Sequence, residues 1–228
     1  MMNRFVSVAI DGPAGAGKST MARAVAKELG YVYVDTGAIY RTVGYYINLC
    51  GIGPKDVDGV TRLIDDVNIE ILYSDDGLQH MILNGKDVSG EIRTQEMSDY
   101  ASKLSTLKVV REFLLDVQRD LARTHNVVMD GRDIGTVVLP KADVKIYLTA
   151  SAEVRANRRL LEMQQKGDKK STFEMVLRDI KQRDDRDMNR PIAPLKRAAD
   201  AELLDTSDLT IEESITAIKR IIEKRLQK

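Results

Sequence analysis

The sequence has little of what marks secreted, membrane or nucleic-acid-binding proteins. Cys50 is the only cysteine, so no disulfide can form within the chain, which fits a reducing compartment. The 35 Lys and Arg residues are balanced by 35 Asp and Glu residues, so the basic surplus of a protein that grips long nucleic acid is missing. No stretch approaches the length of about 18 apolar residues that a membrane span needs. The short apolar run before Asp11 is too small for a signal peptide. We therefore expect a cytoplasmic protein whose partners include neither a membrane nor a nucleic acid polymer.

What the chain does have is an apolar fraction of 43% over 228 residues, which favours one large domain carrying a subdomain. Strand-like and helix-like segments alternate at its start. Apolar strands are expected over 5–11 and 31–35, and helices over about 21–29 and 38–50. This alternation predicts a parallel sheet with right-handed crossovers. Further strands of this kind are expected at 126–130, 144–150 and 201–206.

The middle of the chain has a different pattern. Residues 68–88 hold two strand-like runs around Ser-Asp-Asp-Gly and include an Asn-Gly turn at 84–85, which predicts a small antiparallel sheet. We expect residues 62–105 to form an inserted subdomain. Capping boxes, in which a Ser or Thr and a Glu three residues later satisfy each other's backbone amides, are expected at Ser171–Glu174 and Thr210–Glu213.

The stretch GPAGAGKST, residues 12–20, matches the complete P-loop pattern, with an apolar strand before it and a helix after it. Glycines let several backbone N–H groups turn toward an anion, and the helix N-terminus adds partial positive charge. Lys18 is expected to reach the β- and γ-phosphates of a nucleoside triphosphate, and the Ser19 hydroxyl to ligate Mg²⁺. The residues expected around ATP are Gly12, Pro13, Ala14, Gly15, Ala16, Gly17, Lys18, Ser19 and Thr20.

The sequence lacks the motifs of two other P-loop classes, the Asn-Lys-x-Asp of GTPases and the Ser-Gly-Gly-Gln of transporter ATPases. It has instead arginines beside short polar motifs, as in DTGAIYR (35–41), DGRDIGT (130–136) and QRDDRDMNR (182–190). A kinase with a phosphate acceptor needs such cations, because its two substrates repel each other. Arg183 and Asp187 share one side of a helix, and an ordinary surface pair at i and i+4 is the alternative interpretation.

Five motifs resemble, in order, those of the bacterial cytidylate kinase family: IDGPAGAGKST, VDTGAIYR, VSGEIRTQE, DGRDIGTVVLP and RDDRDMNRPIAPL. The resemblance extends from residue 6 to about residue 206. It implies an α/β fold in which residues 1–228 form a single P-loop kinase domain with a three-layer core around a parallel sheet. The antiparallel insert would bind the monophosphate, and a helical lid would lie at about 155–190. The implied reaction is Mg²⁺-dependent transfer of the ATP γ-phosphoryl to CMP or dCMP.

The resemblance also implies a substrate-binding set. Ser102, Arg111 and Asp133 are expected around the cytosine, where a carboxylate can accept a hydrogen bond from the exocyclic amine. Uracil offers a carbonyl at that position, which would leave buried polar groups unpaired. Arg41, Arg132 and Arg183 resemble the monophosphate contacts, and Asp187 resembles the ribose contact. The full set is Thr36, Tyr40, Arg41, Ser102, Arg111, Arg132, Asp133, Arg183, Asp187 and Arg190.

Three assignments within this set stay open. Thr36 keeps the hydroxyl of the family's serine but adds a methyl group, which leaves the choice between ribose and deoxyribose undecided. Tyr40 is either a wall of the sugar pocket or a core tyrosine. Asp130 is expected to hold Mg²⁺ through water beside Ser19, but Asp35 also ends an apolar strand and competes for that role.

Catalysis is expected to come from positioning and charge, with Lys18, Arg132, Arg183 and Arg158 around the transferring group. Arg158 belongs to the RANRR run at the start of the lid, in which Arg155 and Arg159 are further candidates, with Arg186 nearby. The alternative is that these arginines only solubilise an exposed helix. We predict in-line transfer without a covalent intermediate, because the acceptor phosphate is already ionised.

Two other functions remain open from the sequence. One is a small-molecule P-loop kinase that acts on another monophosphate or on an acceptor such as shikimate. The other is a nucleotide-dependent switch that hydrolyses slowly and signals to a partner protein. We expect a monomer, since no exposed apolar stripe stands out, with CMP, dCMP and ATP as its small-molecule partners.

Overall fold

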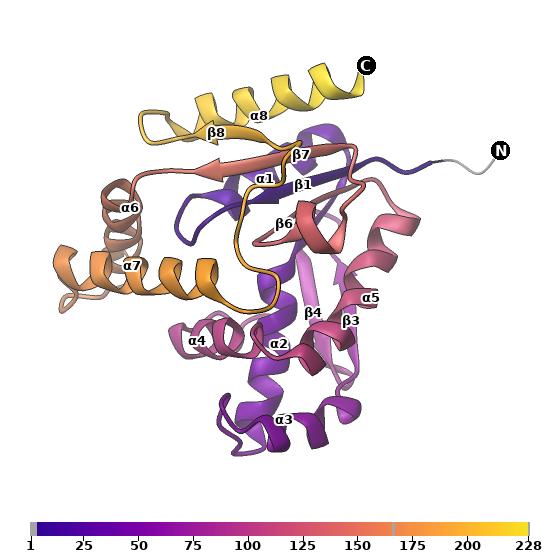
Figure 1. The fold of residues 1–228 in the computed structure, drawn as a ribbon, viewed down its shortest axis with the longest axis vertical. Coiled ribbons are helices and arrows are strands. Elements are labelled where there is room, and N and C mark those ends of the chain that lie inside the picture. Colours follow the sequence, from indigo (N-terminus) through magenta and orange to yellow (C-terminus); the bar gives the residue numbers. More distant parts are fainter. Residues whose placement is uncertain (1–3, 166, 228) are drawn as a thin grey trace.

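The computed structural model describes residues 4–165 and 167–227. Its centre is a five-stranded parallel sheet in the order β2-β6-β1-β7-β8 (Figure 1). The parallel sheet predicted from the alternating pattern is confirmed, and each predicted strand is present. The strands are β1 (Ser7–Asp11), β2 (Val32–Asp35), β6 (Val127–Gly131), β7 (Val144–Thr149) and β8 (Glu202–Asp205).

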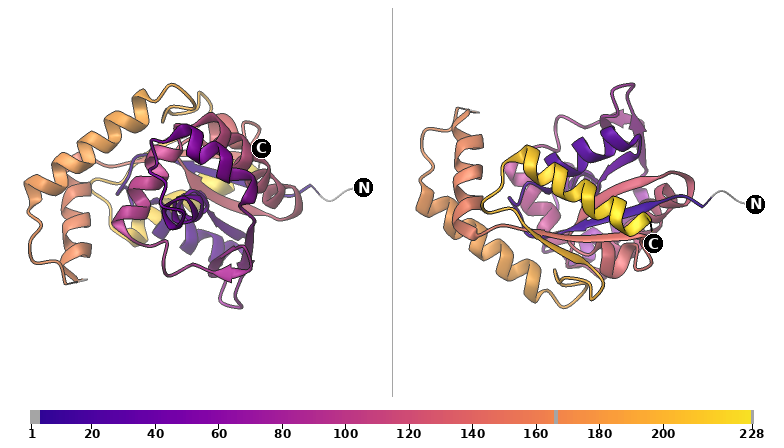
Figure 2. Two further views of the ribbon diagram at one scale, coloured as in Figure 1. Left: turned by 90° about the horizontal axis from the view of Figure 1, so that it is seen from below. Right: turned by 90° about the horizontal axis from the view of Figure 1, so that it is seen from above.

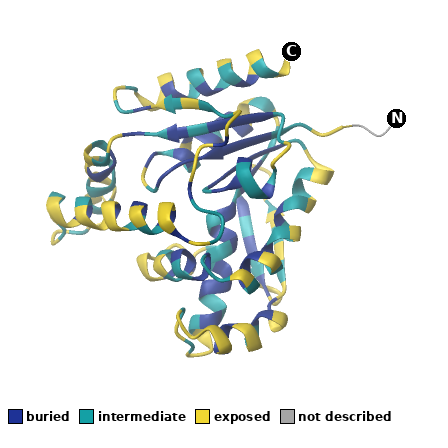
Figure 3. Ribbon diagram, in the orientation of Figure 1, coloured by how far each residue is buried: buried dark blue, intermediate teal, exposed yellow. Residues whose placement is uncertain are grey.

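Helices cover both faces of this sheet and give three layers. On one face, α1 (Lys18–Leu29) and α8 (Ile211–Leu226) pack in an apolar cluster that includes Val8 and Ile10. On the other face, α2 (Thr36–Leu49) and α5 (Lys108–Thr124) pack in a cluster that includes Ala9. From Val8 onward β1 is buried (Figure 3), and its residues Val8, Ala9 and Ile10 are consecutively apolar, as is typical of a strand that is covered on both faces.

The carboxyl ends of β1, β2 and β6 meet at one edge of the sheet. The register pairs Asp11 with Gly131 and Asp35 with Asp130. Three segments start at this edge: the P-loop, α2, and the connection to a π-helical turn, η2 (Ile134–Val138). In open α/β sheets the crevice beyond the carboxyl ends of the strands is where ligands bind.

A second sheet is antiparallel and has three strands, β3 (Ile69–Tyr73), β4 (Gln79–Leu83) and β5 (Lys86–Asp87). The predicted Asn-Gly turn joins β4 to β5, and both of its residues have positive φ, 49° and 82°. Before this sheet lie α3 (Val57–Leu63) and a 3₁₀ turn, η1 (Ile64–Asp66), and after it lies α4 (Gln95–Leu104). Both β4 and α4 contact α2, so this region is attached to the helix that starts beside the P-loop.

The helices α6 (Ala152–Gln165) and α7 (Phe173–Asn189) form a pair that projects from the main body (Figure 2). They pack on each other through an apolar cluster of their own that contains Ala156, Val176 and Ile180. Within 4–165 and 167–227, no helix combines the length and the apolar character needed to cross a membrane.

Two helix starts differ in how well they were predicted. The capping box at Thr210–Glu213 is confirmed, with both of its hydrogen bonds formed. The capping box at Ser171–Glu174 is wrong, because Thr172 is the N-cap of α7 and its hydroxyl accepts from the Met175 amide. The hydroxyl of Ser171 instead donates to Asp168 at 2.7 Å, which holds Ser171 in the preceding turn.

Candidate active site

The P-loop leaves β1 through a turn that only glycine permits. Gly12 has a φ of 153°, and a Cβ there would lie 1.9 Å from the carbonyl oxygen of Leu148. Gly15 and Gly17 also have positive φ, 73° and 83°. The helix α1 then begins without a side-chain cap and without an acidic residue in its first turn. Its unpaired N–H groups and its dipole therefore favour an anion at this point.

Three cations, Lys18, Arg132 and Arg183, repel one another beside the P-loop. The Lys18 side chain is 5% exposed, and its ammonium donates to the carbonyl of Pro13 at 2.7 Å. Burial, followed by the positive charge of Arg132, lowers the pKa of Lys18 to about 7. Burial and the charge of Arg132 likewise lower the pKa of Arg183 to about 10. Cations that are desolvated and repel one another are stabilised by a bound anion.

Acidic partners satisfy only part of this cluster. Arg132 donates from Nε to Asp187 at 2.9 Å, and Arg41 pairs with Asp35 at 2.9 Å. Burial alone would raise the pKa of Asp187, but Arg132 and Arg183 outweigh it, so the pKa is lowered. The Nε atoms of Arg41 and Arg183 are buried without a hydrogen-bond partner. The expected phosphate residues Arg41, Arg132 and Arg183 thus lie in one network with unused donors.

A pair of oxygen donors lies at the start of α1. The Ser19 hydroxyl donates to Oδ2 of Asp130 at 3.0 Å, and the Tyr33 hydroxyl donates to Oδ1 of the same carboxylate at 2.8 Å. Burial, followed by the charge of Asp35, raises the pKa of Asp130 to about 6. Asp35 is otherwise engaged, since it caps α2 through the Ala38 amide as well as pairing with Arg41. Of the two candidate metal carboxylates, Asp130 is therefore the one beside Ser19.

Asp133 is held from two sides. Its Oδ2 forms an ion pair with Arg111, and its Oδ1 accepts from Arg190 at 3.0 Å. All three side chains are buried. Arg190 also donates to the Ser105 hydroxyl at 3.1 Å. The structure thus brings together Asp133 with two of the expected substrate-binding arginines.

The remaining expected substrate residues surround this group. Ser102, on α4, accepts from Arg186 at 3.1 Å. Thr36 donates its hydroxyl to the carbonyl of Asp130 at 2.8 Å, so only its lone pairs are free for a ligand. Burial raises the pKa of Tyr40 to about 12, and the charges of Arg111 and Asp133 also act on its hydroxyl. Tyr40 therefore lies beside the base-side residues as well as against the core.

The arginines of the expected lid have separate roles. Arg155 is 5% exposed, pairs with both oxygens of Asp184 and donates to the carbonyl of Ala14 in the P-loop at 3.0 Å. Arg158 points elsewhere, because its guanidinium donates to the carbonyls of Thr206 and Leu209 after β8. The expected role of Arg158 at the transferring phosphate stays a prediction. Arg159 pairs with Glu162 and donates to Gln95 of α4.

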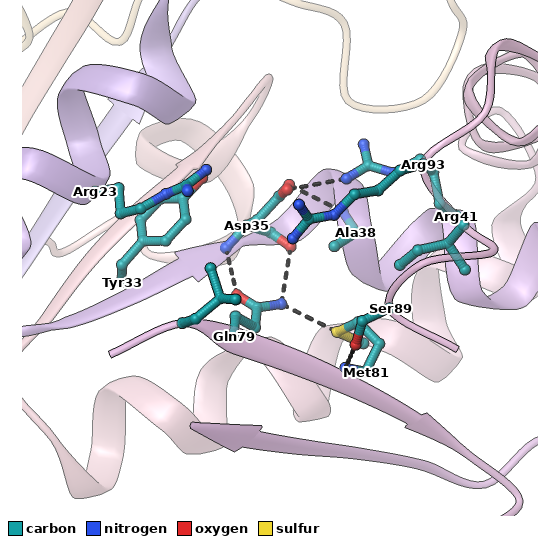
Figure 4. A pocket seen from close by; sticks show the side chains of 11 residues that line it. Arg23, Tyr33, Asp35, Ala38, Arg41, Gln79, Met81, Ser89 and Arg93 are labelled. Atoms are coloured by element: carbon teal, nitrogen blue, oxygen red, sulfur yellow. Dashed lines mark hydrogen bonds and ion pairs between the residues drawn. The ribbon is translucent and has the colours of Figure 1, made fainter. Parts of the chain in front are cut away.

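A pocket beside the network brings Arg41 and Asp35 together with Arg23, Gln79 and Arg93, three residues to which the sequence assigned no role. Arg23, Arg41 and Arg93 come from three separate segments and line it together with Asp35 and Gln79 (Figure 4). Arg23 also lies over the Tyr33 ring, 5.8 Å from its centre. Arg93 belongs to the VSGEIRTQE motif. That motif was the available signal, but only the folded insert reveals which side chains Arg93 joins.

Comparisons with known proteins show the family of the chain. The sequence model of the family described as cytidylate kinase matches residues 8–224. A cytidylate kinase from Caldicellulosiruptor saccharolyticus is 46% identical over 219 residues, covering 96% of both chains. One from Lactobacillus gasseri is 47% identical over 224 residues, covering 98% of this chain and 96% of its own. A shikimate kinase structure from Bacteroides thetaiotaomicron has a TM-score of 0.49 at 17% identity, covering 96% of this chain and 98% of its own. That likeness is too remote to bear on the acceptor.

Proposed function

Because the chain belongs to the cytidylate kinase family, we propose that the carboxyl ends of β1, β2 and β6 hold ATP and a cytidine monophosphate with their phosphates facing. The chain is a phosphotransferase. The expected reaction transfers the γ-phosphoryl of ATP to CMP or dCMP and gives ADP and the cytidine diphosphate. The single observation that supports the arrangement is the network of buried cations whose donors and charges are incompletely matched by acids.

On this proposal the protein acts by placing positive charge around the phosphates of its two substrates, where negative charge gathers during transfer. The P-loop amides and Lys18 bind the β- and γ-phosphates of ATP, and Arg41, Arg132 and Arg183 bind the acceptor phosphate. The donor bond breaks as the acceptor oxygen attacks in line. That oxygen is already ionised near neutral pH, so the site needs no general base. Arg93 lines the pocket beside Arg41 and supplies a further cation on the acceptor side.

The oxygen donors beside the P-loop fit Mg²⁺. Magnesium prefers oxygen ligands and is commonly held by one or two carboxylates together with substrate phosphates and water. The Ser19 hydroxyl and Asp130 lie 3.0 Å apart and provide such donors. In the described part of the chain, no three His, Cys, Asp or Glu side chains group to hold a metal alone, so phosphates would complete the set. Bound Mg²⁺ would offset charge between the phosphates.

Base choice is proposed to rest on Asp133. Arg111 and Arg190 fix both of its oxygens, and a fixed carboxylate still has lone pairs for the exocyclic amine of cytosine. Uracil would turn a carbonyl toward it, with no proton between the two oxygens. Ser102 and Arg111 are proposed to complete the base contacts, and Asp187 and Thr36 the sugar contacts.

The two attached regions are proposed to close over the substrates. We assign residues 62–105 to the acceptor side and about 155–190 to a lid that excludes water, because water would otherwise accept the phosphoryl group. Arg155, rather than Arg158, connects this lid to the P-loop through Ala14. We further propose that the protein acts as a monomer in the cytoplasm.

A panel of acceptors tests the proposal directly. ADP formation from ATP and Mg²⁺ would be measured with CMP, dCMP, UMP, AMP and shikimate at equal concentrations. We expect CMP and dCMP to give the highest kcat/KM. A higher value for AMP or shikimate would contradict the proposed acceptor.

A further inference from the structure

Asp11 is a buried carboxylate in the site that the mechanism above does not use. It is the last residue of β1, lies immediately before Gly12 of the P-loop and is 4% exposed. Each of its oxygens accepts a backbone hydrogen bond. Oδ1 accepts from the Ile134 amide at 2.7 Å, and Oδ2 accepts from the Gly135 amide at 2.8 Å.

The two amides belong to the segment that carries Asp133, proposed to contact the base, and Arg132, proposed to contact the acceptor phosphate. Ile134 and Gly135 directly follow Arg132 and Asp133 and begin η2. Space around this contact is tight, because a Cβ on Gly135 would lie 3.3 Å from Oδ2 of Asp11 and 3.1 Å from Cδ of Lys145. A two-point bond to consecutive amides fixes both the position and the direction of the backbone that leaves Asp133.

Holding a carboxylate here is unfavourable for folding in itself. Burial raises the pKa of Asp11 to about 6, although the amides of Gly135 and Ile134 oppose the rise. Groups that are retained despite such a desolvation penalty concentrate at functional sites. We therefore expect the contact between Asp11 and these two amides to serve the reaction rather than stability.

We propose that Asp11 is a positioning residue for base selection, which fixes Asp133 at the correct distance from the P-loop. The proposal rests on the proposed role of Asp133. Asp11 does not touch the nucleotide; it acts through the backbone of 132–135. The strand β1 leads into the P-loop, and β6 leads into Arg132. The contact therefore connects the loop proposed to bind ATP with the segment proposed to recognise the acceptor base.

The test is Asp11→Asn, which preserves shape but turns an amide N–H toward one of the two backbone N–H groups. We expect KM for CMP to rise and the ratio of kcat/KM for CMP over UMP to fall, each on the order of tenfold. KM for ATP should change less than twofold. The matched control is Asp143→Asn, since Asp143 accepts from the Ser7 amide at 2.9 Å at the opposite end of β1. That variant should keep the wild-type CMP/UMP ratio.

Two further variants, Gly135→Ala and Asp133→Asn, complete the test of the role of Asp11. Gly135→Ala leaves the carboxylate in place but crowds it, and it should also lower the CMP/UMP ratio; it replaces Asp11→Asn if that variant does not fold. A folded variant with the wild-type ratio, or an equal loss of affinity for ATP and CMP, would overturn the proposal.

Asp133→Asn, assayed in parallel, distinguishes failure of the proposed role of Asp133 from failure of the proposed role of Asp11. If it loses CMP and UMP activity equally, base recognition by Asp133 fails; if it loses selectivity and Asp11→Asn does not, only the role of Asp11 fails.

Discussion

Lys18 is a buried cation beside the P-loop, and burial together with the charge of Arg132 lowers its pKa to about 7, so a phosphate bound there would stabilise its charged form. Lys18→Ala should therefore reduce kcat by about 10²- to 10³-fold or more, the usual result of deleting one preorganised charge donor. Steady-state transfer to CMP at saturating ATP measures this. Lys27→Ala, on the exposed side of the same helix, is the control and should keep near-normal activity. Near-normal activity of Lys18→Ala would refute its role.

Asp133 provides the second prediction at this scale. An asparagine there loses the ion pairs with Arg111 and Arg190 and can donate to the carbonyl of uracil. We expect Asp133→Asn to lower kcat/KM for CMP by at least about tenfold more than for UMP. Asp120→Asn, on the exposed face of α5, should alter neither value. Parallel kinetics with the two acceptors distinguish these results, and equal losses would remove Asp133 from base recognition.

The sequence indicated which residues would gather at the candidate site but not their individual partners. Arg132 and Arg183, which the family resemblance assigned to the acceptor phosphate, interact with Asp187 in the structure, and their roles toward a substrate stay predictions. Arg158 lay in a suggestive arginine run, yet the loop after β8 takes up its guanidinium. Asp11 received no assignment, because its partners are backbone amides more than 120 residues away. Such contacts depend on the register of β1 against β6, which no local pattern encodes.

Between elements, the Arg155–Asp184 pair joins α6 to α7 and both to the P-loop. Asp184→Ala would leave a buried guanidinium without its carboxylate, which typically costs about 3–5 kcal/mol. We expect a lower Tm and a higher KM for ATP. Asp185→Ala changes the neighbouring exposed carboxylate and is the control. Thermal denaturation and ATP titration of both variants measure the effect, and an unchanged Tm for Asp184→Ala would contradict it.

The start of α8 allows a test of stability without a change in catalysis. Thr210→Ala removes a complete capping box, which should destabilise the protein by about 1 kcal/mol. That corresponds to a Tm lower by about 2–4 °C in a chain of this size. Thr216→Ala, in the exposed middle of the same helix, should shift Tm less, and kcat should stay unchanged in both. A loss of kcat on Thr210→Ala would show that α8 affects the site.

The N-caps of α7 and α8 show how far a short sequence motif can predict where a helix begins. The Thr210 box and the failed Ser171 box have the same spacing of Ser or Thr to Glu. They differ because Asp168 engages the hydroxyl of Ser171 and leaves Thr172 to cap α7. Strands and their order of appearance were predictable, since apolar runs buried on both faces stand out. The choice among adjacent hydroxyl residues is decided by the turn around them.

For the whole molecule, the network of Arg41, Arg132 and Arg183 has positive charge that its acidic partners do not fully neutralise. We therefore expect a bound substrate phosphate to stabilise the folded protein. A ligand at about 100 times its Kd that binds only the folded state adds about 2.7 kcal/mol. CMP at that ratio should therefore raise Tm by about 5–10 °C. Differential scanning calorimetry over a CMP titration checks this, with cytidine as the control that lacks the phosphate. An equal rise with cytidine would place the affinity in the base pocket alone.

The central claim is that ATP gives up its phosphoryl group only when a cytidine monophosphate completes the charge arrangement around Lys18, Arg132 and Arg183. ADP and CDP formation from ATP and Mg²⁺, with and without CMP, tests it most directly. We predict one CDP for each ADP and almost no ADP without CMP. ADP produced at the same rate in the absence of CMP would contradict the claim.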